Sequence, residues 1–211
     1  MREPLRRELH GLDAAIATAG DEAVALLGQA TELLGDPDEQ AAREIIAGAV
    51  AAQARQEDTE TAVERAMALQ TPVARDLRLM LAAALVAYHI ERVAANAGRI
   101  ARLTLEAPPP LGVLPTLQDM GVEACHAMHA ALATFGSIDP AHNVDLDAAA
   151  VHLNELEHQV IDGLTSVSTT PASATALLAA RYLARVGEHA SAIGHRTATV
   201  AFGRADLELD G

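Results

Sequence analysis

The sequence predicts an all-α protein of six long helices, and three observations carry this prediction. Apolar residues recur at alternating spacings of three and four, which is the period of an amphipathic helix. Aromatic residues make up only 2% of the chain, whereas alanine, leucine, glutamate and arginine dominate, and such a composition favours helices over sheets. Prolines and glycines interrupt the apolar pattern at the places where helices would end.

The helix boundaries follow from local capping signals. Asp36 is expected to cap the second helix, with Pro37 in its first turn and Glu39 completing a capping box. Thr71 and Pro72 are expected to open the third helix in a similar way. The six helices are expected over residues 2–34, 37–69, 72–106, 115–137, 144–168 and 172–203.

The prolines from Pro108 to Pro110 form the strongest linker and divide the chain into two units, 1–107 and 113–211, with three helices each. A shift of 93 residues superimposes the apolar stripe of the third helix on that of the sixth. Any two amphipathic helices can match in this way, but the recurring turns support a true repeat. We therefore expect two superimposable three-helix bundles related by a pseudo-two-fold axis. The expected core residues are Ile90, Val93 and Ile100 in the first and Leu183, Val186 and Ile193 in the second.

The charge of the chain excludes several classes of function. Its formal net charge is −14, and with so few aromatic rings for stacking on bases it is not expected to bind nucleic acid. All 15 basic residues are arginines, so the chain has no lysine for a P-loop or a Schiff base. The single cysteine, Cys125, lacks a motif that would activate it. The chain shows neither a signal peptide nor an apolar run of about 20 residues, so we expect a cytoplasmic protein without direct membrane insertion.

Two segments carry a resemblance to a known family. Residues 70–78 read QTPVARDLR, and the residues of ERV at 91–93 are echoed by ARVGEH at 184–189. The chain resembles the PhoU family, whose consensus has a QxPxAxDLR turn into a long helix and an ERxGDHA segment in each repeat. The resemblance extends over nearly the whole chain and implies a non-enzymatic, homodimeric regulator of phosphate homeostasis. Such a negative regulator of phosphate-starvation signalling couples the ATPase subunit of a phosphate ABC transporter to a sensor histidine kinase.

The family motif also implies a metal site, from which this sequence departs. Its Glu and Asp lie one helical turn apart and can bind metal together with carboxylates of a neighbouring helix. Here the first repeat keeps Glu91 but has Ala95, and the second has Ala184 but keeps Glu188. Because each half retains one carboxylate, we expect no cofactor and only weak binding of divalent or iron ions. The alternative interpretation is that Glu91 and Glu188 are ordinary solvated residues that pair with nearby arginines.

A different class of function, a metal-binding bundle for ferritin-like storage or a small oxidase, stays open at this point. Glu155 and His158 have the Glu-x-x-His spacing of di-iron bundles, and Glu157 lies between them. In this alternative Glu91, Glu155, Glu157, His158, Glu188 and His189 converge on one or two ions. The remaining histidines are interpreted as residues of solvated helix faces, because they do not recur at matching positions in both repeats.

The start of the third helix is the candidate partner-binding segment. Thr71, Pro72 and Asp76 are explained by a helix start, where a cap and an acidic residue are favourable. Arg75 and Arg78 are not, since cations near the positive end of a helix are mildly unfavourable. Arg75, Asp76 and Arg78 therefore either lock the bundle by hydrogen bonds or form a docking surface.

Overall fold

The computed structural model is all-α, as the sequence predicts, and describes residues 3–72, 74–165 and 170–202. The long helices are α1 (Glu3–Glu32), α2 (Glu39–Gln70), α3 (Ala74–Thr104), α4 (Leu114–Ser137), α5 (Asn143–Leu164) and α6 (Pro171–Phe202), and the 3-10 helix η1 (Pro140–His142) precedes α5. Helix α5 ends short of the expected position 168, which itself lies outside the described residues, as does position 203. None of the described helices is long and apolar enough to cross a membrane.

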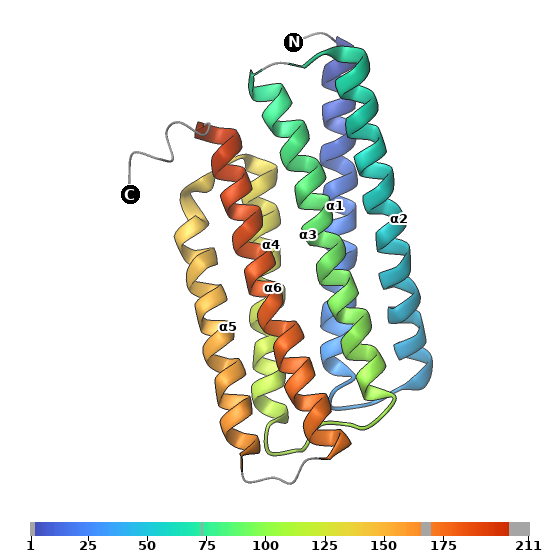
Figure 1. Cartoon of the computed structure of the whole chain (residues 1–211), viewed down its shortest axis with the longest axis vertical. Coiled ribbons are helices and arrows are strands. Elements are labelled where there is room, and N and C mark those ends of the chain that lie inside the picture. The colour runs from blue at the N-terminus through green and yellow to red at the C-terminus, as the bar shows by residue number, and fades with distance from the viewer. Residues whose placement is uncertain (1–2, 73, 166–169, 203–211) are drawn as a thin grey trace.

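The two sets of three helices pack side by side, as Figure 1 shows. Helices α3 and α6 lie next to each other in front of α1 and α4, which also contact each other. Helix α2 packs against α1 and α3 at one edge of the molecule, and α5 packs against α4 and α6 at the other. The central pair, α3 and α6, therefore joins the two halves and exposes one long face to solvent.

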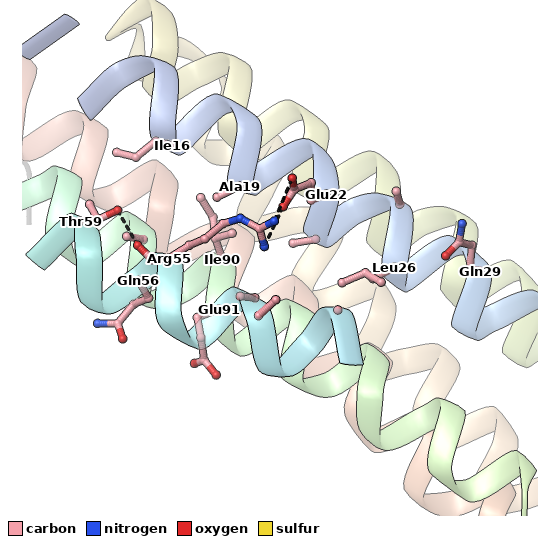
Figure 2. A pocket seen from close by; sticks show the side chains of 16 residues that line it. Ile16, Ala19, Glu22, Leu26, Gln29, Arg55, Gln56, Thr59, Ile90 and Glu91 are labelled. Carbon is pink, nitrogen blue, oxygen red and sulfur yellow. Dashed lines mark hydrogen bonds and ion pairs between the residues drawn. The ribbon is translucent and has the colours of Figure 1, made fainter. Parts of the chain in front are cut away.

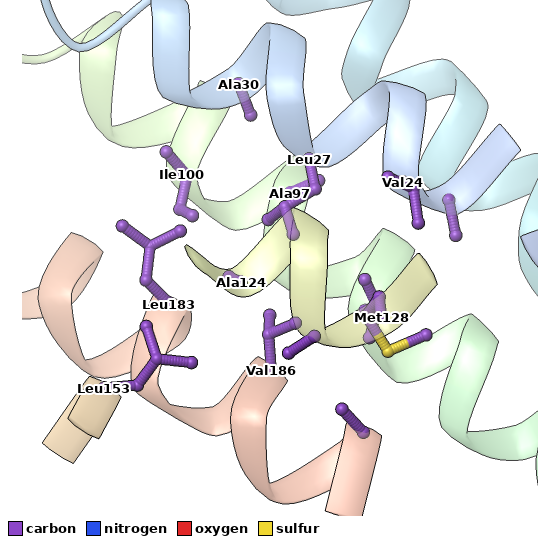
Figure 3. Close-up of a cluster of buried hydrophobic side chains, with 14 of the residues drawn as sticks. Val24, Leu27, Ala30, Ala97, Ile100, Ala124, Met128, Leu153, Leu183 and Val186 are labelled. Atoms are coloured by element: carbon purple, nitrogen blue, oxygen red, sulfur yellow. The ribbon is translucent and has the colours of Figure 1, made fainter. Parts of the chain in front are cut away.

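The main hydrophobic core is continuous between the two halves. Figure 3 shows side chains of α1, α3, α4 and α6 meeting there, with Leu27 and Ile100 from the first half and Met128 and Leu183 from the second. A smaller cluster around Leu9, Val63 and Met80 fills the end of the first half away from this core. The division of the chain into two units, 1–107 and 113–211, stays a prediction.

The predicted core stripe of the repeat is confirmed. Ile90 is 2% exposed, and the side chains of Val93, Ile100, Leu183, Val186 and Ile193 are fully buried. Each of these residues therefore points into the core from α3 or α6. The spacing of three and four that predicted the helices also identified the buried side of both.

The capping residues differ from those expected. Helix α2 is capped by Asp38 rather than Asp36, and its carboxylate accepts a hydrogen bond of 2.6 Å from the backbone N–H of Ala41. Thr71 does not cap α3; it ends α2 in the left-handed conformation, with a φ of 44°. Both errors arise because several acceptors near a turn satisfy the same sequence rule, and only the path of the chain selects one of them.

Candidate functional site

The start of α3 places Arg75, Asp76 and Arg78 within one helical turn. Arg75 is exposed, whereas Asp76 and Arg78 are half-buried. The Nε atom of Arg78 is buried without a hydrogen-bond partner in the described structure. The turn before these residues is unusual, because Ala74 as well as Thr71 has a positive φ, of 49°. Such backbone is strained for residues other than glycine and is found preferentially at functional sites.

Glu91 lies in the middle of α3 and is buried, which corrects the expectation of a solvated carboxylate. It accepts two hydrogen bonds from the neighbouring Arg92, one from Nε and one of 2.6 Å from Nη2. The hydrogen bond to Glu91 is the main cause that raises the pKa of Arg92. Both oxygens of this buried carboxylate are engaged by Arg92, so a metal ion would have to compete with the arginine for them.

The other candidate metal ligands lie on α5 and α6. Glu188 is exposed on α6, and His158 is exposed on α5. Glu157 forms an ion pair with Arg181 of α6, with 3.3 Å between Oε2 and Nη1. Among the described residues, no group of three or more histidine, cysteine or carboxylate side chains is arranged to hold a metal ion. The convergence required by the metal-binding alternative is therefore not seen in this part of the chain.

His89 of α3 and His189 of α6 form a contact that the sequence did not predict. Their Nδ1 atoms lie 3.2 Å apart, and both side chains are half-buried between the two halves. The pKa of His189 is lowered to about 4, first by burial and then by the positive charges of His89, Arg185 and Arg92. The pKa of His89 is lowered by burial and by Arg196. Both rings are therefore neutral at physiological pH, and one Nδ1–H can donate to the other Nδ1.

A cavity of about 310 Å³ opens between α1, α2 and α3 (Figure 2). Alanine is the most frequent residue of its lining, which also includes Ile16, Leu26 and Ile90. Arg55 of α2 forms an ion pair of 2.9 Å with Glu22 of α1 beside it. The charged groups that line the cavity are already paired, so its remaining polar groups are the side chains of Gln29, Gln56 and Thr59.

Cys125 is not suited to act as a catalytic nucleophile. Its side chain is half-buried, and burial raises the pKa of the thiol. Less thiolate is then present at neutral pH, and the thiolate is the nucleophile. The only cysteine of the chain is therefore a packing residue of α4.

Comparison with known proteins gives a consistent result. The model of the PhoU domain matches residues 16–104. A phosphate-specific transport system accessory protein PhoU homolog from Xylella fastidiosa strain Temecula1 is 31% identical over 196 residues, which cover 88% of this chain and 80% of the relative. A protein of the same description from a Burkholderia species is 28% identical over 184 residues, covering 82% and 78%.

Two crystal structures share the fold. PhoU from Pseudomonas aeruginosa has a TM-score of 0.86 at 18% identity, with 94% of this chain and 99% of that chain covered. The phosphate transport system regulatory protein PhoU from Streptococcus pneumoniae has a TM-score of 0.86 at 19% identity, with coverage of 95% and 98%. These relatives are described as accessory and regulatory proteins of phosphate transport. The sequence identity over most of both chains and the shared six-helix fold show that this chain belongs to the PhoU family.

Proposed function

We propose that this protein is a cytoplasmic, non-enzymatic regulator of phosphate uptake, which links the ATPase subunit of a phosphate ABC transporter to a sensor histidine kinase. The observation that carries the proposal is the 31% identity, over 88% of the chain, to a phosphate-specific transport system accessory protein. In this role the protein lowers the phosphate-starvation response when phosphate is abundant.

The features of the molecule suit binding better than chemistry. Arg75 presents an exposed charge at the start of α3, next to the left-handed residues Thr71 and Ala74. Strain at a turn that carries exposed charge supports a docking role for this segment. Because Arg78 is half-buried, its side chain is better placed to position that turn than to contact a partner directly.

Metal is given no essential part in this proposal. Glu91 is paired with Arg92, and Ala95 and Ala184 stand where the family motif has carboxylates. We therefore keep weak binding of divalent or iron ions at Glu91 or Glu188 as an accessory property only. The regulatory role does not depend on it.

Deletion of the gene tests the regulatory role. A reporter of the phosphate-starvation response should rise at high external phosphate in the deletion strain, and the intact gene should restore repression. In parallel, the purified protein should bind the purified ATPase subunit and the purified cytoplasmic region of the kinase from the same genome. An unchanged reporter together with no binding to either protein would overturn the proposal.

A further inference from the structure

The charges of the molecule are strongly segregated between its helices. Helices α3 and α6 together carry eight arginines against three carboxylates, Asp76, Glu91 and Glu188. Helices α4 and α5 carry seven carboxylates and no arginine. In a chain with a net charge of −14, the central pair of helices is therefore a basic layer between acidic neighbours.

Four of the eight arginines of this layer can share one face of the α3–α6 pair. On α3, Arg92 and Arg99 are seven residues apart, and on α6 Arg185 and Arg196 are eleven apart, so each pair shares one side of its helix. Arg99 reaches across to α6, with its guanidinium carbon 5.6 Å from the centre of the Tyr182 ring. Arg99 therefore spans the junction of α3 and α6, the two helices that lie in front in Figure 1.

Two of these arginines have free charge. Arg185 and Arg196 are exposed, and neither has an ion-pair partner among the described residues. Their charge also acts on the two histidines at the junction. Burial is the largest cause of the lowered pKa of His89 and Arg196 is the second, and Arg185 contributes to the lowered pKa of His189. The charges of Arg185 and Arg196 are therefore unpaired among the described residues, whereas that of Arg92 is paired with Glu91.

Exposed apolar side chains accompany the arginines. On α3, Leu81, Leu85 and Tyr88 follow one another at spacings of four and three and are 46%, 38% and 45% exposed. On α6, Leu178 is 42% exposed and lies 93 residues after Leu85, the same shift that relates Arg185 to Arg92. The repeat thus presents leucine and arginine twice on one face. Tyrosine and arginine beside apolar residues are typical of protein interfaces and not of sites for a small anion.

We propose that this α3–α6 face, defined by Leu85, Tyr88, Arg92, Arg99, Leu178, Arg185 and Arg196, docks an acidic and partly apolar helical face of a partner protein. Charge complementarity selects the occupant. An acidic partner is repelled by α4 and α5 and attracted to the basic layer, where Arg185 and Arg196 add unpaired charge on this face.

The α3–α6 face is separate from the start of α3. Arg75 and Arg92 are 17 residues apart on one helix, which corresponds to roughly 25 Å along its axis. An adaptor needs two surfaces that can be occupied together, and these two meet that need. The inference therefore rests on the proposed adaptor function and extends it by assigning a second docking surface.

The test compares three charge-reversal variants against the parent protein. Arg185→Glu/Arg196→Glu changes the α3–α6 face, and Arg75→Glu changes the start of α3. Arg43→Glu/Arg65→Glu is the matched control, because both arginines are exposed on α2 and the change in charge is the same as in the first variant. The probes are the purified ATPase subunit and the purified cytoplasmic region of the kinase, each titrated by calorimetry, and each variant is first checked for parental circular dichroism.

The variant of the α3–α6 face should bind one of the two probes at least tenfold more weakly, while the control binds that probe within twofold of the parent and Arg75→Glu weakens the other probe instead. If the reversal perturbs folding, Arg185→Gln/Arg196→Gln removes the charge without adding acid and should weaken the same probe. Equal binding by the face variants and the control overturns the inference and leaves the adaptor function standing. Binding of neither probe by the parent overturns both. A dimer that sedimentation shows to be lost only in the face variants identifies a second copy as the occupant and also overturns the inference.

Discussion

His89 and His189 connect the two halves of the molecule, with 3.2 Å between their Nδ1 atoms. A second polar contact lies nearby, where the side-chain amide of Asn96 donates to the carbonyl oxygen of Tyr182 at 3.4 Å. A shift of 93 residues carries His89 onto Tyr182 and Asn96 onto His189. The two contacts thus occupy equivalent places in the repeat, and this supports the predicted pseudo-two-fold axis between α3 and α6.

The histidine pair should make stability depend on pH. The folded pKa of His189 is about 4 and its ordinary value is 6.5, so between these values the unfolded chain binds more protons. The pair's contribution to the free energy of unfolding should be complete above pH 6.5 and decrease as the pH falls towards 4. Urea denaturation at several pH values should show a flatter dependence for His89→Gln/His189→Gln than for the parent.

The control for this experiment is His126→Gln/His129→Gln, which changes two exposed histidines of α4. Carboxylates also titrate in this range, so the informative quantity is the difference between each variant and the parent. If both double variants follow the parental curve, the histidine contact is not formed in solution.

The contact between the histidines shows where reasoning from sequence reached its limit. The helices, the buried stripe and the repeat follow from periodicity, because burial of an apolar face requires it. The pairing of His89 with His189 does not follow from periodicity, since the two residues are 100 positions apart and the repeat matches His189 with Asn96. The burial of Glu91 was missed for a similar reason: only the structure shows that Arg92 folds back to pair with its neighbour.

Close packing between α1 and α4 predicts opposite effects for two glycine substitutions on α4. A Cβ at Gly121 would lie 2.5 Å from the hydroxyl oxygen of Thr31 and 2.8 Å from its Cβ. Thr31 cannot easily move, because it is buried and its hydroxyl donates to the carbonyl of Leu27 at 2.9 Å. Gly121→Ala should therefore lower the free energy of unfolding by about 1–3 kcal/mol through overpacking.

Gly136→Ala is the matched change near the end of the same helix. No atom lies within 4 Å of a Cβ placed there, so the gain in helix propensity is unopposed. It should raise stability by up to about 1 kcal/mol. Chemical denaturation of both variants checks the packing, and equal effects of the two would contradict the close approach of α1 and α4.

Ile90→Ala should lower the free energy of unfolding by about 2–5 kcal/mol, because it leaves a cavity in the core. Ile90 is 2% exposed, whereas Val50 of α2 is 67% exposed, and Val50→Ala should cost less than about 0.5 kcal/mol. Urea denaturation of the two variants gives the comparison. A loss at Ile90 as small as that at Val50 would mean that the predicted repeat alignment is wrong.

The metal content of the purified protein should be well below roughly one equivalent of iron or zinc, because the motif retains too few carboxylates. Ala95→Asp places a carboxylate one turn after Glu91 at a half-buried position and should raise the content. Ala184→Glu is not an equivalent test in the second half, since Ala184 is fully buried. Elemental analysis of protein purified without chelator measures the metal content of the parent and of each variant, with Ala47→Asp at an exposed position as the control. Stoichiometric metal in the parent protein would favour the metal-binding alternative.

Arg75 and Arg78 should separate binding from folding. Arg75→Glu changes an exposed residue near a positive helix end, where a negative charge is favourable, so the melting temperature should stay within a few degrees of the parent. Arg78→Glu should cost more stability, because part of the Arg78 side chain is buried.

If the start of α3 docks a partner, Arg75→Glu should weaken binding to the transporter ATPase or the kinase, and the remaining binding should depend less on salt, since one charge pair is lost. Thermal melts and titrations at two salt concentrations measure both effects. A variant at Arg75 that melts far below the parent would instead assign this arginine to the bundle's own hydrogen bonding, and the docking of the first partner would have to be sought on another face.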